Sequence, residues 1–101
     1  MGSLIALAEK EIVRKEILML CQEAGELGCS REVLNAALKK YGFESEYNLD
    51  TELLYLEDKG LIRVHTVANV RLNIRRKIVH IAAKGIDYLD GTGEDIPGIG
   101  V

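Results

Sequence analysis

The sequence predicts a mainly α-helical protein with a small β-hairpin, an α+β fold built as one domain. Apolar residues recur with a helical period through roughly the first sixty positions. The period then changes to the alternation of β-strands, and a last short helical pattern follows. The chain has 101 residues, of which 48% are hydrophobic and 29% charged, and this composition suits one globular domain.

The first expected helix runs from about Leu4 to Ala24. Its apolar side chains recur mostly at helical spacings; they are Ile5, Ala8, Ile12, Ile17, Leu20 and Cys21. Charged side chains fall largely between them, so one face of this helix is expected to be buried. Gly25 and Gly28 then break the helical pattern.

A second helix is expected to begin after Ser30, because a serine hydroxyl can accept one of the free amide hydrogens of a first helical turn. Its buried stripe is expected to consist of Val33, Leu34, Ala37 and Leu38. Gly42, which follows two lysines, is expected to end this helix in a left-handed conformation.

Two residues compete to cap the third helix, Ser45 and Asn48. The helix is expected to continue to about Lys59, where Gly60 closes it. Three leucines share one of its faces, with Leu54 and Tyr55 on either side; they are Leu49, Leu53 and Leu56.

A β-hairpin is expected next, because residues 61–67 and 70–81 are rich in β-branched residues. The reversal between the two strands lies either at Asn69 or in the stretch 73–76, and the sequence does not decide between them. Residues 83–89 are expected to form a last short helix, weakened by Gly85.

The chain is therefore expected to divide into a domain over residues 1–90 and an irregular C-terminal tail over residues 91–101. The tail is rich in glycine and turn-forming residues. It is expected to pack loosely or to stay mobile.

Charge is distributed unevenly along the chain, whose net charge is −3. Residues 1–60 carry seven basic and twelve acidic side chains, and residues 85–101 carry four acids and no base. The segment between them, residues 61–84, has six basic side chains and no acid; they are Arg63, Arg71, Arg75, Arg76, Lys77 and Lys84. This positive segment coincides with the expected hairpin and predicts contact with a polyanion.

Three helices followed by a hairpin are the layout of a winged helix, in which the third helix enters a DNA groove and the hairpin is the wing. The stretch 53–62, LLYLEDKGLI, resembles the junction between helix three and wing in winged-helix regulators. The stretch 82–91, AAKGIDYLDG, is similar to the segment that ends many such wings, with two alanines in place of the usual Leu-Thr. Together with the final DIPGI, these stretches resemble small winged-helix proteins of Mu-like prophages.

The resemblance and the charge pattern lead us to expect a DNA-binding protein, either a transcriptional regulator or a phage accessory factor. The expected phosphate contacts come from the hairpin, and the expected contacts near the groove come from the third helix. These residues are Arg63, Arg71, Arg75, Arg76 and Lys77 on the hairpin, and Asn48, Thr51 and Tyr55 on the helix. The wing is expected to contribute more than the helix, since residues 46–59 carry five acids against Lys59 alone.

Two alternatives stay open at this point. The hairpin cations could instead pair with acids of the first helix or the tail and merely be solvated. The acidic third helix also suits a protein-interaction or assembly adaptor that uses the same fold. A homodimer is expected in the DNA-binding case, with apolar residues of the first helix as its seam: Leu4, Ile5, Leu7, Leu18 and Met19.

Catalysis, metal binding and membrane insertion are not expected. Cys21 falls on an apolar helix face, which indicates a core residue, while Cys29 before a helix start has a smaller prospect of being a reactive thiolate. The spacings of Cys21, Cys29, His65 and His80 are unlike those of structural zinc sites, so no cofactor is expected. With no long apolar run and no basic leader at its start, the chain is expected to be cytoplasmic.

Overall fold

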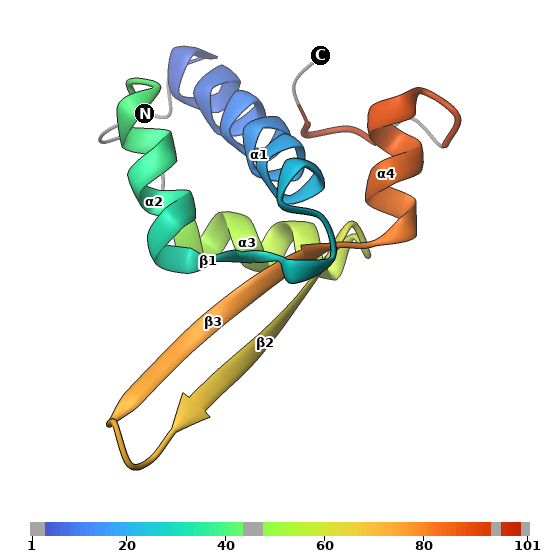
Figure 1. Cartoon of the computed structure of the whole chain (residues 1–101). Coiled ribbons are helices and arrows are strands. Elements are labelled where there is room, and N and C mark those ends of the chain that lie inside the picture. Colours follow the sequence, from blue (N-terminus) through green and yellow to red (C-terminus); the bar gives the residue numbers. More distant parts are fainter. Residues whose placement is uncertain (1–3, 44–47, 94–95, 100–101) are drawn as a thin grey trace.

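The computed structural model describes residues 4–43, 48–93 and 96–99. Over these residues the protein is an α+β structure with four α-helices and a three-stranded antiparallel sheet (Figure 1). The elements are α1 (Leu4–Ala24), the 3-10 turn η1 (Gly25–Leu27), β1 (Cys29–Ser30), α2 (Arg31–Lys40), α3 (Leu49–Asp58), β2 (Ile62–Asn69), β3 (Ile74–Ile81) and α4 (Ala83–Asp90). The expected order of helices and hairpin is confirmed.

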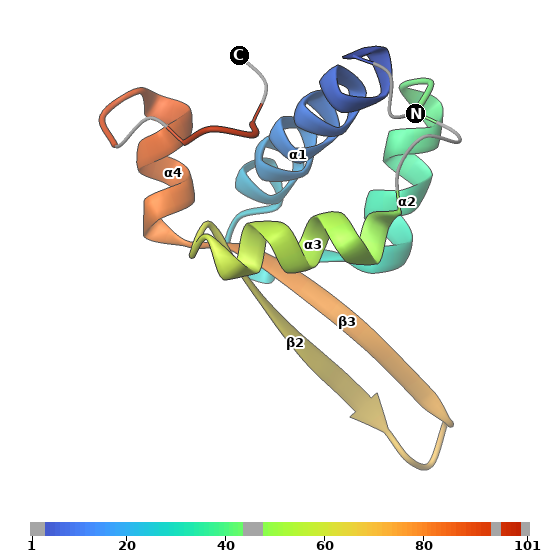
Figure 2. The ribbon, with the colours of Figure 1, turned by 180° about the vertical axis from the view of Figure 1, so that it is seen from behind.

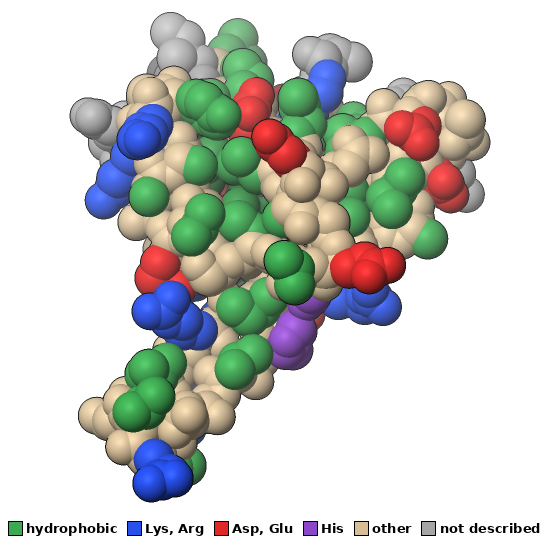
Figure 3. All heavy atoms as spheres, viewed as in Figure 1, with side chains coloured by type: hydrophobic (Ala, Val, Ile, Leu, Met, Phe, Trp, Pro, Cys, Tyr) green, Lys and Arg blue, Asp and Glu red, His purple; other side chains and the backbone are tan. Residues whose placement is uncertain are grey.

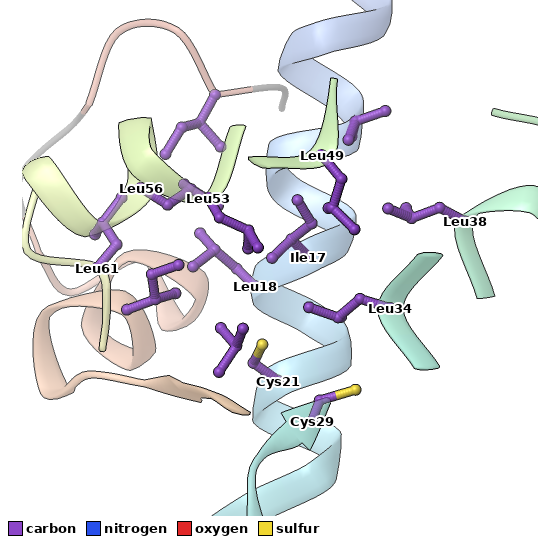
Figure 4. Packing of buried hydrophobic residues seen from close by; sticks show 14 of the residues in the cluster. Ile17, Leu18, Cys21, Cys29, Leu34, Leu38, Leu49, Leu53, Leu56 and Leu61 are labelled. Carbon is purple, nitrogen blue, oxygen red and sulfur yellow. The ribbon is translucent and has the colours of Figure 1, made fainter. Parts of the chain in front are cut away.

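The helices form a body from which the β2–β3 hairpin projects, as the views from the front and from behind both show (Figures 1 and 2). The molecule consequently extends 46 × 33 × 22 Å. Helix α1 lies at the centre of the body, and Figure 4 shows side chains of α2 and α3 converging on it. Ile17 and Leu18 of α1 and Leu34 of α2 are fully buried there.

The core also holds the root of the hairpin. Leu61, just before β2, and Ile62, the first residue of β2, are buried in it together with Val79 of β3. Burying such aliphatic side chains contributes about 1.5–3 kcal/mol each. The root of the hairpin is therefore fixed to the body, while the distal part is exposed.

The ends of α2 and α3 are closed largely as expected. The hydroxyl of Ser30 accepts a hydrogen bond from the amide of Val33 at 3.2 Å, and Gly42 has a φ of +92° just after α2. For α3 the cap is Asn48, whose side-chain oxygen accepts from the Thr51 amide at 3.2 Å. Its competitor, Ser45, lies outside the described residues.

The hairpin reverses over residues 70–73, between the two positions that the sequence left open. Asn69 pairs with Ile74 and accepts a hydrogen bond from the Leu72 amide at 3.1 Å, while Asn73 takes a positive φ of +52°. The expectation that residues 70–73 are extended is therefore wrong. Asparagine tolerates the left-handed conformation that this turn requires, and so the strand begins only at Ile74.

The sheet has the order β1-β3-β2. Its two-residue strand β1, which pairs Cys29 with Val79, was not predicted from the sequence. A strand of this length has no periodic pattern to detect.

Gly85 has a packing role in α4 that the sequence did not indicate. It is buried, and a Cβ atom at this position would collide with the backbone oxygen of Leu61 and the side chain of Ile81. Glycine is therefore needed at this position because α4 lies directly against the root of the hairpin.

The C-terminal tail is not loose over residues 96–99, and that expectation is wrong. Ile96 and Ile99 are buried in the core. The hydroxyl of Tyr55 donates to the Pro97 carbonyl at 2.7 Å, and Arg14 Nη1 donates to the Gly98 carbonyl at 2.8 Å. The tail thus packs on α1 and α3.

The apolar residues expected to form a dimer seam on α1 do not all lie on its surface. Leu18 is fully buried, so it cannot belong to such a seam. Leu4, Leu7 and Met19 are exposed, and nothing is described of the Ile5 side chain. Among the described residues, no helix has the length and apolar character needed to cross a membrane.

Candidate nucleic-acid interface

The hairpin divides its basic side chains between two faces and a tip. Thr66 lies opposite Lys77 and Ala68 opposite Arg75, on the face that continues from the buried Val79 and its partly buried partner Val64. Because side chains alternate along a strand, Arg63 and Arg76 point to the opposite face. Arg71 lies in the turn at the tip.

The structure therefore brings together only part of the predicted phosphate-binding set. We call Arg75 and Lys77 the front cations and Arg63 and Arg76 the back cations. The front cations share a face with α3, because a hollow of about 340 Å³ is lined by both of them and by residues of α2 and α3. A single flat surface could not contact all five basic side chains at once.

All five hairpin cations are exposed, and within the described residues none of them forms an ion pair. The two ion pairs in that part of the chain join Arg14 to Glu52 and Arg31 to Asp50. Figure 3 shows basic and apolar side chains on the projecting hairpin and acidic ones on the body. Within the described residues, no ion pair joins a hairpin cation to an acid of the first helix or the tail, as the alternative of a neutralised hairpin would require.

Two acidic residues, Glu32 and Asp50, line the hollow beside the front cations. Arg31 holds Asp50 with two hydrogen bonds, of 2.7 and 3.1 Å. The hydrogen bond from Arg31, together with the charges of Arg31 and Lys77, lowers the pKa of Asp50 below its usual value against a smaller opposing effect of burial. Asp50 therefore stays ionised near neutral pH and attenuates the positive field of Lys77.

The surface of α3 that faces solvent is acidic. Its exposed residues are Asp50, Thr51, Leu54, Glu57 and Asp58. Glu57 also accepts a hydrogen bond from the Val64 amide at 3.2 Å, which ties α3 to the outer edge of β2. A helix with this surface would meet DNA phosphates at an electrostatic cost, as the sequence indicated.

The three groove-facing candidates on α3 have different surroundings. Thr51 is exposed and makes no side-chain hydrogen bond in the described part, whereas the Asn48 side chain is used to cap the helix. Tyr55 faces the tail: its hydroxyl is bound to Pro97, and the guanidinium of Arg14 lies 3.8 Å from its ring centre. Tyr55 therefore does not share a surface with the front cations.

A second hollow, of about 640 Å³, lies behind the root of the hairpin. Arg63, His65 and His80 line it together with Glu26 of η1 and Ile86 of α4. The two imidazole rings are stacked, with centroids 4.9 Å apart and planes inclined by 13°. The sequence does not show this stack, because it depends on the register of the hairpin. His80 pairs with Arg63, and this places it diagonally across from His65 on the same face.

Arg31 is the other residue that sequence analysis missed. It follows the cap residue Ser30 directly, and the fold places it in the same hollow as Arg75 and Lys77. No signal in the sequence marks this proximity, because Arg31 and Lys77 are brought together only by the packing of α2 against the hairpin.

The two cysteines are buried, as expected for Cys21. Burial and the neighbouring Cys29 raise the pKa of Cys21 to about 12, and burial also raises the pKa of Cys29. Burial thus disfavours the thiolate of Cys29, which is the reactive form of a cysteine. Within the described residues, no group of three or more His, Cys, Asp or Glu side chains is arranged to hold a metal ion.

Comparisons of the chain with models of known protein families, with curated proteins and with solved structures give no match.

Proposed function

We propose that the chain is a winged-helix, DNA-binding protein whose wing is the β2–β3 hairpin. The order of α1, α2, α3, hairpin and α4 supports this architecture. The stretch that resembles a helix-to-wing junction runs from the second half of α3 to the start of β2, and in it Leu53, Leu56 and Leu61 are buried and Gly60 has a φ of +76°. A role as a transcriptional regulator or phage accessory factor follows from the same resemblance.

One observation carries the DNA-binding proposal. Five exposed basic side chains project from an otherwise acidic molecule, and none forms an ion pair within the described residues. Unpaired cations on a projecting hairpin can displace counterions from DNA phosphates, which supplies affinity without sequence preference. The exposure of the front cations beside α3 and of Arg71 at the tip supports this contact. Asn48 and Thr51, close to Asp50 along the chain, remain the candidates on α3.

The test compares two double variants that remove the same charge from opposite faces. One is Arg75→Ala/Lys77→Ala, and its matched control is Arg63→Ala/Arg76→Ala. Binding to a random duplex is followed by fluorescence anisotropy over a series of salt concentrations. Three phosphate contacts predict a slope of roughly −3 for log affinity against log salt in the parent protein.

We expect the front variant to lose about two units of that slope, because two phosphate contacts are removed. The back variant is expected to keep most of it. Equal losses in both variants would contradict a defined front face. An absence of binding by the parent protein at low salt would contradict DNA binding altogether.

A second candidate is the non-catalytic protein adaptor, and the exposed surface of α3 favours it. Leu54 is 66% exposed and lies among the exposed carboxylates of Asp50, Glu57 and Asp58. Such a surface fits a partner that presents an apolar side chain surrounded by lysines or arginines. Titration with a synthetic amphipathic peptide of leucine and lysine, followed by NMR, would shift α3 resonances under this alternative, and Leu54→Ser would abolish the shift.

A further inference from the structure

The outer edge of β2 is open along most of its length. In the order β1-β3-β2, the strand β2 has a partner strand on one side only among the described residues. The Val64 amide points away from β3, because it donates to Glu57. In an antiparallel pair, successive residues of a strand direct their backbone groups alternately toward and away from the partner strand. The Ala82 amide donates to the Leu61 carbonyl at 2.9 Å, so the odd-numbered residues of β2 are those that bond to β3. Thr66 and Ala68 therefore direct their amide and carbonyl groups outward.

This edge lacks the features that usually prevent strands from pairing. Residues 64–70, VHTVANV, contain no Asp, Glu, Lys, Arg or Pro, whereas natural edge strands are protected by charge or proline. The free distal part of β3 does have this protection, since Arg75, Arg76 and Lys77 lie along it. Val67 is 49% exposed and Val70 is 93% exposed, so apolar surface accompanies the open edge.

We propose that the β2 edge pairs with the β2 edge of a second copy, forming a two-fold antiparallel ribbon of two wings. In this register Thr66 exchanges its backbone hydrogen bonds with Ala68 of the other copy, and Val67 lies opposite Val67. Glu57 keeps its hydrogen bond to Val64, so the ladder is confined to the distal part of the strand. The apolar side chains at Val67 cover each other across the two-fold axis.

Charge selects a second copy rather than an unrelated extended peptide. The uncharged edges meet at the seam, while the basic β3 strands lie on the two outer edges, as far apart as the ribbon allows. In this register Arg71 at the tip of each wing falls opposite Arg63 of the other copy, and the carboxylate of Glu57, which is bound to the neighbouring Val64 amide, lies beside these two cations and offsets their repulsion. The interface is isologous, so the same patch of both copies is covered.

The ribbon has a consequence for the proposed DNA-binding face. A two-fold axis perpendicular to the sheet leaves both sets of front cations on the same side of the ribbon. The inference itself does not depend on DNA binding, because the pairing is measured on the protein alone.

Cysteine cross-linking tests the register directly. In an antiparallel pair of the type expected at position 67, the Cα atoms are about 4.5 Å apart, which a disulfide can span. The full chain is prepared with Val67→Cys or, as the control, with Val70→Cys, and is oxidised with glutathione disulfide. The native Cys21 and Cys29 are buried in both proteins.

Position 70 is the more exposed, so random collision would cross-link the control faster. The proposed ribbon predicts the reverse, with Val67→Cys dimerising about tenfold faster because pairing raises the effective thiol concentration. Equal rates, or a faster control, would overturn the proposal.

Oligomeric state gives a second measurement that needs no cysteine. Light scattering over a concentration series is expected to show a dimer for the parent and a monomer for Val67→Glu. The new carboxylate lies opposite Arg76 of the same hairpin, so the variant is expected to keep its fold. The comparison variant is Ile12→Glu on the exposed side of α1. A parent protein that is monomeric throughout, or a dimer broken only by Ile12→Glu, would overturn the ribbon; the latter would place the seam on α1.

Discussion

Arg14 is the residue that ties the tail to the helical body. Its Nε atom lies 2.6 Å from Glu52 Oε2, its Nη1 atom donates to Gly98, and its guanidinium stacks on Tyr55. The Glu52 side chain is only 1% exposed, so this carboxylate depends on Arg14 for its partner. The spacing of Leu49, Leu53 and Leu56 places Glu52 on the buried stripe of α3. Its partner Arg14 lies 38 residues earlier in the chain, and no local pattern in the sequence connects the two.

Removing Arg14 alone should therefore be more damaging than removing both partners. Arg14→Met is expected to lower the free energy of unfolding by about 3–5 kcal/mol, because it leaves a buried charge unpaired. Adding Glu52→Leu should restore much of that loss, since the buried charge is then gone. Urea unfolding of both single variants and the double variant provides the cycle. Additive losses would show that the two residues are not coupled.

Among the elements, those with a clear period could be predicted and those fixed by tertiary contact could not. The helices over residues 4–24 and 31–40 follow apolar spacing and capping residues, which are local signals. The hairpin was expected for the same reason, although the pairing of Asn69 with Ile74 was needed to locate its turn. The tail has no period at all, and its attachment depends on Arg14 and Tyr55, which are distant in sequence.

The attachment of the tail should contribute measurably to stability. Ile99 is 6% exposed, and Ile99→Ala is expected to cost about 2 kcal/mol or more, because it removes a buried side chain and leaves a cavity. The matched control is Val70→Ala at the tip of the wing, where the side chain is 93% exposed and the change should cost less than about 0.5 kcal/mol. Both values follow from urea midpoints. Equal midpoints for the two variants would mean that the tail does not pack on the core in solution.

At the scale of the whole molecule, the distribution of charge matters more than the net charge of −3. The hairpin cations extend beyond the acidic body, so a polyanion can approach them without crossing the body (Figure 3). The exception is the hollow between α2, α3 and the wing, where Glu32 and Asp50 lie with Arg31 and the front cations. These two acids are close enough to oppose an approaching phosphate.

Neutralising the two acids should therefore strengthen DNA binding. The variant Glu32→Gln/Asp50→Asn frees Arg31 from its ion pair, and we expect its affinity for duplex DNA to rise about tenfold at low salt and to approach that of the parent at high salt. The control, Glu23→Gln/Asp90→Asn, makes the same change in net charge at exposed positions on α1 and α4. Anisotropy titrations of the three proteins separate the two effects. If the control gained as much affinity as the first variant, net charge would govern binding rather than the hollow beside the wing, which Glu32 and Asp50 line and Glu23 and Asp90 do not.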